Sequence, residues 1–221
     1  GVNSPFDYTP WTANTDWIDA VTRTGKFNAN NLSVAGGTEK NKFTLGLGYT
    51  SDEGLIRHEK LEKYLFSFND EFKFSKTLKV GFNFNASRQN NPYNATYVLD
   101  QARKVIPMVP SGTKSFYTKN PYGLDSLNQD LYYELPSIQN SGVVNPLIQL
   151  ENEWDKTKSI EFRTVTSVFA EINFLKNFSW KTTLYADISN VNTRVYKPTY
   201  YSYDLAANAD FLISSATKVN E

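Results

Sequence analysis

Carboxylates are the side chains of this sequence whose types and spacing could do chemistry. Glu151, Glu153 and Asp155 alternate along one short stretch, and Asp204 and Asp210 form a second set. Glycoside hydrolysis needs two such groups, one as general acid and the other as base or nucleophile. The sequence outlines no cleft around either set, so we interpret both as solvated loop charges.

The histidine at position 58 is the other candidate for chemistry. His58 lies beside Arg57, Glu59 and Lys60 in a short expected loop, with no further metal ligand at a suitable spacing. Serines abound, but none has a histidine placed to activate it, and the chain has no cysteine. We therefore predict a solvated loop histidine, no catalytic, cofactor-binding or metal-binding residue, and a protein that is not an enzyme.

The composition favours β-sheet structure. The 221 residues carry a formal net charge of +0, and 15% of them are aromatic. Balanced charge offers no basic surface for nucleic acid, and no apolar run is long enough for a transmembrane helix. Tyr and Phe favour pleated surfaces, so strands are the elements to look for.

Strict alternation of apolar and polar residues is the main structural signal. It is cleanest between residues 78 and 87, where each even position is apolar and each odd position is polar or glycine. The same pattern predicts six strands, at about residues 28–36, 42–50, 64–74, 78–87, 160–172 and 178–188, and a further strand beginning near Thr193.

Such strands suit either a soluble antiparallel sandwich or a transmembrane barrel. Three observations favour the barrel: polar faces rich in Asn, Ser, Thr and Gly, aromatics near strand ends, and connections that alternate between short and long. The short connections are residues 37–41, 75–77 and 175–177, and the long ones are 51–61, 89–157 and the stretch after 196.

The barrel interpretation assigns a direction to each face of the strands. Phe side chains of the third and fourth strands should meet lipid, while the Asn and Ser residues between them should face the lumen. A slip of one residue would exchange the two sets. The lipid set is Leu45, Leu47, Phe66, Phe68, Phe82 and Phe84, and the lumen set is Thr44, Ser67, Asn69, Asn83 and Asn85.

The interpretation also divides the chain into segments. We expect an external loop at 1–27, four barrel strands in two hairpins at 28–88, and a long extracellular loop at 89–157. A hairpin of barrel strands follows at 158–195, and 196–221 is an external loop or the start of the next strand. Short helices are expected at Asp16–Arg23 and at Tyr97–Val105, the second ended by Pro107.

Several short motifs resemble the SusC/RagA family of TonB-linked outer-membrane transporters. The resemblance covers residues 14–90 well and residues 145–200 more loosely. The motifs are Thr15-Asp16-Trp17, Asn31-Leu32-Ser33-Val34-Ala35-Gly36-Gly37-Thr38-Glu39-Lys40, Leu47-Gly48-Tyr49, Glu53-Gly54-Leu55-Ile56, Leu78-Lys79-Val80-Gly81 and Asn145-Pro146-Leu147.

The resemblance implies a bacterial outer-membrane location and a plugged barrel of about 22 strands, of which this chain would supply six or seven. It implies import of oligosaccharides or peptides with energy from TonB, through a plug that has no counterpart here. It also implies a SusD-like surface lipoprotein as partner. The alternative is a non-transporting all-β module, either an adhesin-like or structural barrel or a soluble binding domain, whose upstream coding sequence would contain no plug.

The segment 89–157 is unusually aromatic for a loop, so we expect it to be folded. Exposed Tyr and Trp rings could stack on sugar rings or contact a peptide or a lid protein. The same rings could instead form the loop's own small core. The candidate contact residues are Tyr132, Tyr133 and Trp154.

Overall fold

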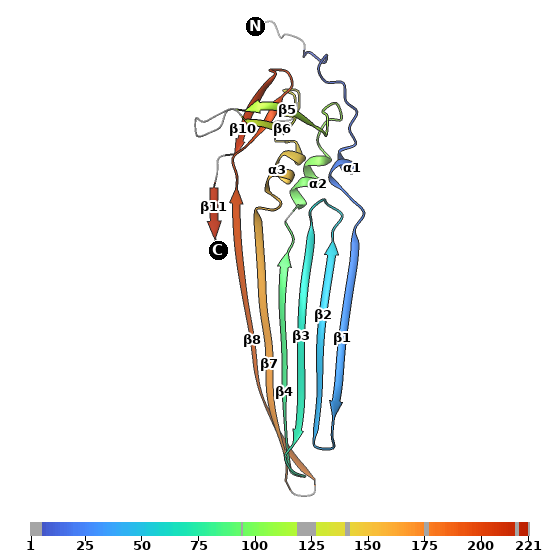
Figure 1. The fold of residues 1–221 in the computed structure, drawn as a ribbon, viewed down its shortest axis with the longest axis vertical. Helices are drawn as coiled ribbons and strands as arrows, with labels where there is room; N and C mark the ends of the chain where they lie inside the picture. Colours follow the sequence, from blue (N-terminus) through green and yellow to red (C-terminus); the bar gives the residue numbers. More distant parts are fainter. Residues whose placement is uncertain are drawn as a thin grey trace.

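The computed structural model describes residues 6–93, 95–118, 127–139, 142–174, 177–214 and 217–220. A long seven-stranded sheet carries smaller helices and hairpins at one of its ends (Figure 1). The strand order is β1-β2-β3-β4-β7-β8-β11, and each neighbouring pair is antiparallel. The expectation of an all-β, antiparallel architecture is confirmed.

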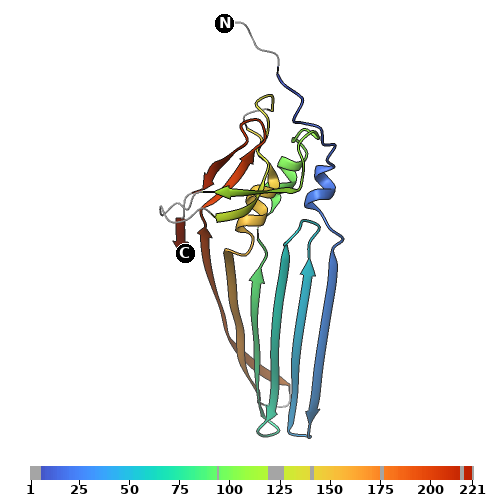
Figure 2. The ribbon, with the colours of Figure 1, turned by 45° about the horizontal axis from the view of Figure 1, so that its top comes forward.

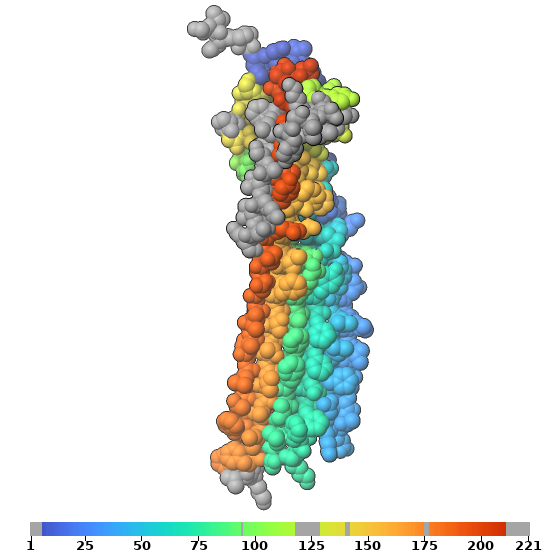
Figure 3. Space-filling model, turned by 60° about the vertical axis from the view of Figure 1, so that its left-hand side comes forward, coloured from blue at the N-terminus to red at the C-terminus, as the bar shows by residue number. Residues whose placement is uncertain are grey.

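The sheet strands are long, and they lie side by side as continuous stripes in the space-filling view (Figure 3). They are β1 (Lys26–Gly37), β2 (Asn41–Glu53), β3 (Lys60–Lys73), β4 (Leu78–Asn91), β7 (Thr157–Phe174), β8 (Phe178–Lys197) and the short β11 (Thr217–Asn220).

The strand register joins apolar residues to apolar residues. Leu47 pairs with Phe66, and Phe68 pairs with both Leu45 and Phe84. Directly paired residues share a face of the sheet, so the six residues expected to face lipid lie together. The five residues expected to face the lumen lie on the opposite face, because Thr44 pairs with Asn69 and the rest alternate with the apolar set.

The expectation of a further strand near Thr193 is wrong. Thr193 lies inside β8, where it pairs with Ser159 of β7. Alternation fades after Ile188, but β8 continues to Lys197 because hydrogen bonds to β7 hold it extended. The seventh strand of the sheet is β11, which pairs with the upper end of β8.

The short connections gather at one end of the sheet, at the bottom of Figure 1. Between β1 and β2, the backbone N–H of Thr38 donates to the carbonyl of Asn41 over 2.7 Å. Between β3 and β4, Ser75 Oγ accepts from the N–H groups of Thr77 and Leu78, a turn that Ser favours for this reason. Residues 175 and 176 of the third expected turn lie outside the described residues.

The opposite end of the sheet carries the cap, by which we mean the helices and short strands outside the sheet together with their connections. Figure 2 shows its helices and hairpins above the strand ends. The elements are α1 (Trp17–Val21), α2 (Thr96–Ala102), α3 (Pro146–Glu153), β5 (Thr113–Thr118), β6 (Leu127–Tyr132), β9 (Tyr200–Asp204) and β10 (Ala209–Ser214).

The cap has a hydrophobic core of its own. Side chains from all three helices meet there with Ile56 of the β2–β3 connection. The expected helices near residues 16–23 and 97–105 are present as α1 and α2, and the expectation that segment 89–157 folds is confirmed by α2, α3, β5 and β6. The core residues are Trp11, Trp17, Val21, Ile56, Ala95, Val98, Ala102, Val105, Val109, Leu147 and Leu150.

The helix α3 was not expected from the alternation, although its start has a local signal. Asn145 is its N-cap, with Oδ1 accepting from the N–H of Leu147 over 3.0 Å, and Pro146 follows at the first helical position. Asn at the cap and Pro directly after it are both preferred at helix starts. The helix buries Leu147 and Leu150 in the core that it shares with α1 and α2.

Candidate functional site

The sheet presents one apolar face that the cap leaves uncovered. Leu184 is 75% exposed and Ile188 is 66% exposed on β8, and Leu32 on β1 is 63% exposed. The register places these residues on the same face as the phenylalanines of β3 and β4. A contiguous apolar surface of this extent requires a covering partner.

Aromatic rings border this apolar face at both of its ends. Tyr49 and Tyr64 lie 5.1 Å apart near the cap, and Phe72 and Phe74 lie 4.6 Å apart near the turns. Paired rings at both edges are typical of the girdles that flank the apolar band of membrane barrels. Within the apolar set of β3, Asp70 is the charged exception, and its Oδ1 accepts from Asn41 Nδ2 over 3.0 Å.

The opposite face is polar, and two ion pairs cross its strands, Arg163 with Asp187 and Lys79 with Glu71. Arg163 of β7 binds Asp187 of β8 through two hydrogen bonds, of 3.0 and 2.6 Å. Asn83 of β4 donates to Ser167 of β7 over 3.0 Å. A polar face of this kind suits contact with water or with a polar domain inside a barrel.

Phe169 of β7 is an aromatic residue on this polar face. The ring of Phe169 lies over Gly81, where an added Cβ would clash with it. The ammonium of Lys181 lies 4.3 Å from the ring centroid and that of Lys79 lies 5.6 Å from it. Lys79 also forms an ion pair with Glu71. Gly81 thus gives Phe169 room to lie flat between two cations.

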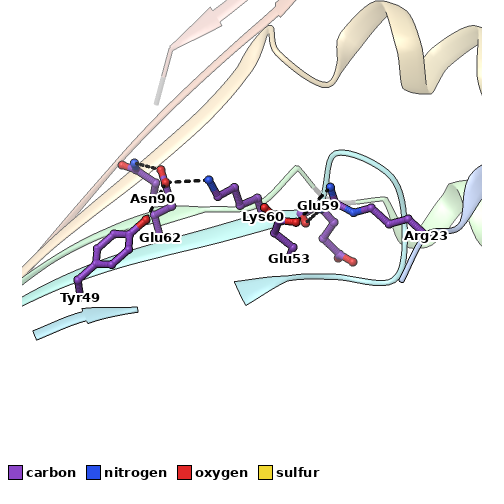
Figure 4. A network of polar contacts seen from close by, with 7 residues as sticks. All are labelled: Arg23, Tyr49, Glu53, Glu59, Lys60, Glu62 and Asn90. Carbon is purple, nitrogen blue, oxygen red and sulfur yellow. Dashed lines mark hydrogen bonds and ion pairs between the residues drawn. The ribbon is translucent and has the colours of Figure 1, made fainter. Parts of the chain in front are cut away.

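A polar network crosses the upper end of the apolar face (Figure 4). Glu62 accepts from the Tyr49 hydroxyl over 3.3 Å and from Asn90 Nδ2 over 3.4 Å, and it pairs with Lys60 over 3.0 Å. These four residues come from β2, β3 and β4, so the network ties the three strands together just above the apolar band.

Arg23 connects the cap to the same region (Figure 4). Its guanidinium donates to the carbonyl of Glu59 over 2.7 Å and to that of Gly54 over 3.2 Å, and lies 3.8 Å from Glu53. The chain that follows α1 is therefore fastened to the β2–β3 connection, which carries the core residue Ile56.

Two of the candidate contact residues pack inside the cap. Tyr132, at the end of β6, and the adjacent Tyr133 both lie against the core. Burial, aided by the charge of Glu151, raises the pKa of Tyr132. The ring of Tyr133 packs edge-on against Tyr203 at 5.7 Å, and its carbonyl accepts from Asn145.

Trp154 lies apart from that packing. It is 39% exposed at the end of α3, where its ring stacks on His58 at 4.3 Å. The structure therefore does not bring the three candidates together as one exposed surface, and a ligand or lid contact by them stays a prediction.

The interpretation of His58 as a solvated loop residue is wrong. Its Nε2 lies 2.9 Å from Glu151 Oε2, and its side chain is more than two-thirds buried. Arg57 lies 3.9 Å from the other oxygen of the same carboxylate. These contacts form because α3 places Glu151 and Trp154 above the β2–β3 connection, which the sequence does not reveal.

Glu153 also departs from the expected solvated charge. It is 4% exposed and accepts from the Tyr200 hydroxyl over 2.7 Å and from Gln149 over 3.1 Å. Burial, together with Glu153, raises the pKa of Tyr200 above its usual range, and burial raises the pKa of Tyr93 to about 12. This cluster holds the cap together across residues 93–200.

The described residues contain no group of three His, Cys, Asp or Glu side chains arranged to hold a metal ion. The described helices include none with the length and apolar character needed to cross a membrane.

The two-faced sheet defines the class of the chain as the wall of an antiparallel β-barrel. No protein-family profile matches the sequence. The chain is 25% identical over 193 residues to TonB-dependent receptor P3 of Formosa agariphila, covering 87% of the chain and 18% of that protein. It is 27% identical over 176 residues to TonB-dependent receptor SusC of Bacteroides thetaiotaomicron, covering 74% of the chain and 17% of the receptor.

The fold of the chain is also similar to that of solved transporter structures. A RagAB peptide importer in its closed-closed state aligns with a TM-score of 0.60 and 20% identity, covering 84% of this chain and 20% of the other. These matches confirm the resemblance to TonB-linked transporters of the SusC/RagA type. The chain spans about a fifth of the length of the relatives that it matches.

Proposed function

We propose that this chain forms part of the barrel wall of a TonB-dependent transporter in the bacterial outer membrane, and that it is not an enzyme. The transporter imports oligosaccharides or peptides, takes energy from TonB through a plug outside this chain, and works with a SusD-like surface lipoprotein. The observation that best supports this proposal is that the sheet has one uncovered apolar face and one polar face. The relatives are receptors and a peptide importer, which supports transport over catalysis.

In this proposal the two ends of the sheet lie on opposite sides of the membrane. The short turns face the periplasm and the cap lies outside the cell, since barrels of this kind have short periplasmic turns and long external loops. The apolar face meets lipid, and the face carrying Arg163, Asp187 and Asn83 lines the interior around the plug.

The cap is the proposed surface for ligand and lid. Tyr132, Tyr133 and Trp154 are its candidate contacts, and Trp154 presents the exposed ring among them. Trp154→Ala should lower uptake by the full-length transporter more than Tyr117→Ala, a change at another exposed cap ring. Equal uptake by wild type and Trp154→Ala would remove Trp154 from the site.

Cysteine labelling of intact cells tests the topology. A cysteine placed at Ser111 in the cap should react with a membrane-impermeant reagent, while one at Thr38 in the β1–β2 connection should not. Reaction at Thr38 alone would invert the proposed orientation, and labelling of both in intact cells would contradict a membrane-spanning wall. Permeabilised cells provide the control, because both positions should then react.

A further inference from the structure

Two hollows adjoin each other on the apolar face, just below the cap. The lower hollow, of about 620 Å³, is lined mostly by apolar and aromatic side chains of that face, among them Leu32, Leu47, Tyr64, Phe66 and Phe162. The upper hollow, of about 540 Å³, is lined by polar and charged groups that include Lys60, Asn90 and Lys158. Arg88 lines both, so the two hollows adjoin at this residue, and we refer to them together as the groove.

The upper hollow is lined by the cations Lys60, Arg88 and Lys158 and by two carboxylates, Glu62 and Asp155, of which Asp155 is paired with Lys156. Arg88 of β4 pairs with Phe162, and Lys158 of β7 pairs with the neighbouring Arg194 of β8, which places Arg88, Lys158 and Arg194 on the apolar side of the sheet. Among the described residues, none of the three forms an ion pair with a carboxylate. Lys60 differs, because Glu62 neutralises it.

The cations at this height differ in what holds them. On the opposite face Arg163 is bound in a two-bond ion pair by Asp187. Arg88 instead rests its guanidinium over the ring of Phe162, 5.8 Å from the centroid, so its charge is oriented by an aromatic residue and remains available to an anion.

From this arrangement we propose that the groove binds a lipid with a phosphate-bearing headgroup. The acyl chain lies in the apolar hollow along β2, β3 and β4, and the phosphate lies between Arg88 and Lys158. A free phosphate would use the cations but leave the apolar hollow unfilled. Long basic side chains at the border of the apolar band can reach headgroups in this way. The inference rests on the proposed function, which places this face in the bilayer.

The test uses the full-length transporter purified in detergent, with bound lipid counted by native mass spectrometry. Phosphatidylglycerol is the probe, and diacylglycerol with the same acyl chains provides the comparison without phosphate. Wild type should retain phosphatidylglycerol and lose diacylglycerol. Arg88→Gln should weaken retention of phosphatidylglycerol about fivefold, and Arg88→Gln with Lys158→Gln should weaken it about 25-fold, as expected for two cations near a phosphate headgroup.

Lys63→Gln is the matched control. Lys63 precedes Tyr64, the residue that pairs with Arg88, so it lies at the same height but on the opposite face. Its replacement removes the same charge and should leave lipid retention unchanged. Equal retention by wild type and Arg88→Gln would overturn the proposal, as would release of the lipid by inorganic phosphate at matched ionic strength.

Cell fractionation separates this inference from the proposed function. If only the lipid site fails, wild type and Arg88→Gln both reach the outer-membrane fraction and import substrate, and their lipid counts are equal. If the proposed function fails, wild type is absent from that fraction and imports nothing.

Discussion

The cap and the sheet use apolar side chains in opposite ways, although they belong to one chain. Leu150 of the cap is fully buried among helices, whereas Leu184 of the sheet is 75% exposed. The cap encloses its own core as a water-soluble domain does. The described residues of the sheet enclose no such core, so the stability of the sheet depends on what covers its outward face. In the proposed function that cover is the bilayer.

Polar side chains are also arranged differently in the cap and in the sheet. In the cap, two buried amide side chains bond within the protein: Gln101 accepts from the N–H of Val144, and Asn145 donates to the carbonyl of Tyr133. In the sheet, polar side chains gather on the face opposite the apolar band, where Arg163 binds Asp187 and Lys79 binds Glu71 across strands. Both regions therefore bond polar side chains to one another, but the cap does so in a closed interior and the sheet on an open face.

Replacing one leucine by alanine in each region should produce the largest difference in stability between the cap and the sheet. Leu150→Ala should destabilise the cap by about 2–5 kcal/mol, because it leaves a cavity in a packed core. Leu184→Ala should cost far less, since its side chain packs on no protein core. Hydrogen exchange of cap amides in the full-length protein measures the first effect. Equal protection of those amides in both variants would contradict the contrast.

Charge insertion tests which face of the sheet meets lipid. Phe82→Arg should destabilise the folded barrel by about 2–4 kcal/mol if position 82 lies near the middle of the bilayer. Asn83→Arg puts the same side chain one residue along, on the opposite face, and should cost much less. Denaturant titration of the full-length protein refolded into lipid vesicles measures both. Comparable losses would refute the assignment of the faces.

Removal of one buried hydroxyl should have a moderate effect confined to the cap. Tyr200→Phe takes away the donor to Glu153 and should cost the cap about 1–3 kcal/mol, because a buried acceptor loses a partner. Tyr117→Phe is the control, as its side chain is exposed. Hydrogen exchange near α3 and β9 should increase only in the first variant. Unchanged exchange there would mean that Gln149 alone satisfies the carboxylate.

Alkaline pH should produce the smallest loss of cap stability. Burial raises the pKa of Tyr93 from an ordinary value of 10.0 to about 12, and raises that of Tyr200. A raised pKa means that the folded cap favours the protonated form, so this stabilisation is complete below pH about 10 and is lost as pH rises toward 12. Cap protection should therefore fall over that range, and fall less in Tyr93→Phe. Equal pH dependence in both proteins would exclude Tyr93 as a cause.

The sequence by itself determined the strands of the sheet and their two faces. A pleated backbone alternates its side chains with a period of two, so Phe82 and Asn83 must point in opposite directions wherever the strand lies. The hydroxyls and amides of the two short turns are similarly local, as the bonds of Ser75 to Thr77 and Leu78 show. The alternation of apolar and polar residues does not mark the ends of β7 and β8, because both strands continue into segments that lack it.

Only the tertiary structure decided the environment of the charged cap residues. His58 and Glu151 are 93 positions apart, and their contact depends on how α3 packs against the β2–β3 connection. Tyr200 and Glu153, 47 positions apart, meet in the same way. Local patterns carry no information about such pairs, because the burial of a side chain is set by which distant elements fold over it. For that reason Glu153 resembles a surface charge in the sequence, and lies buried with two hydrogen bonds in the fold.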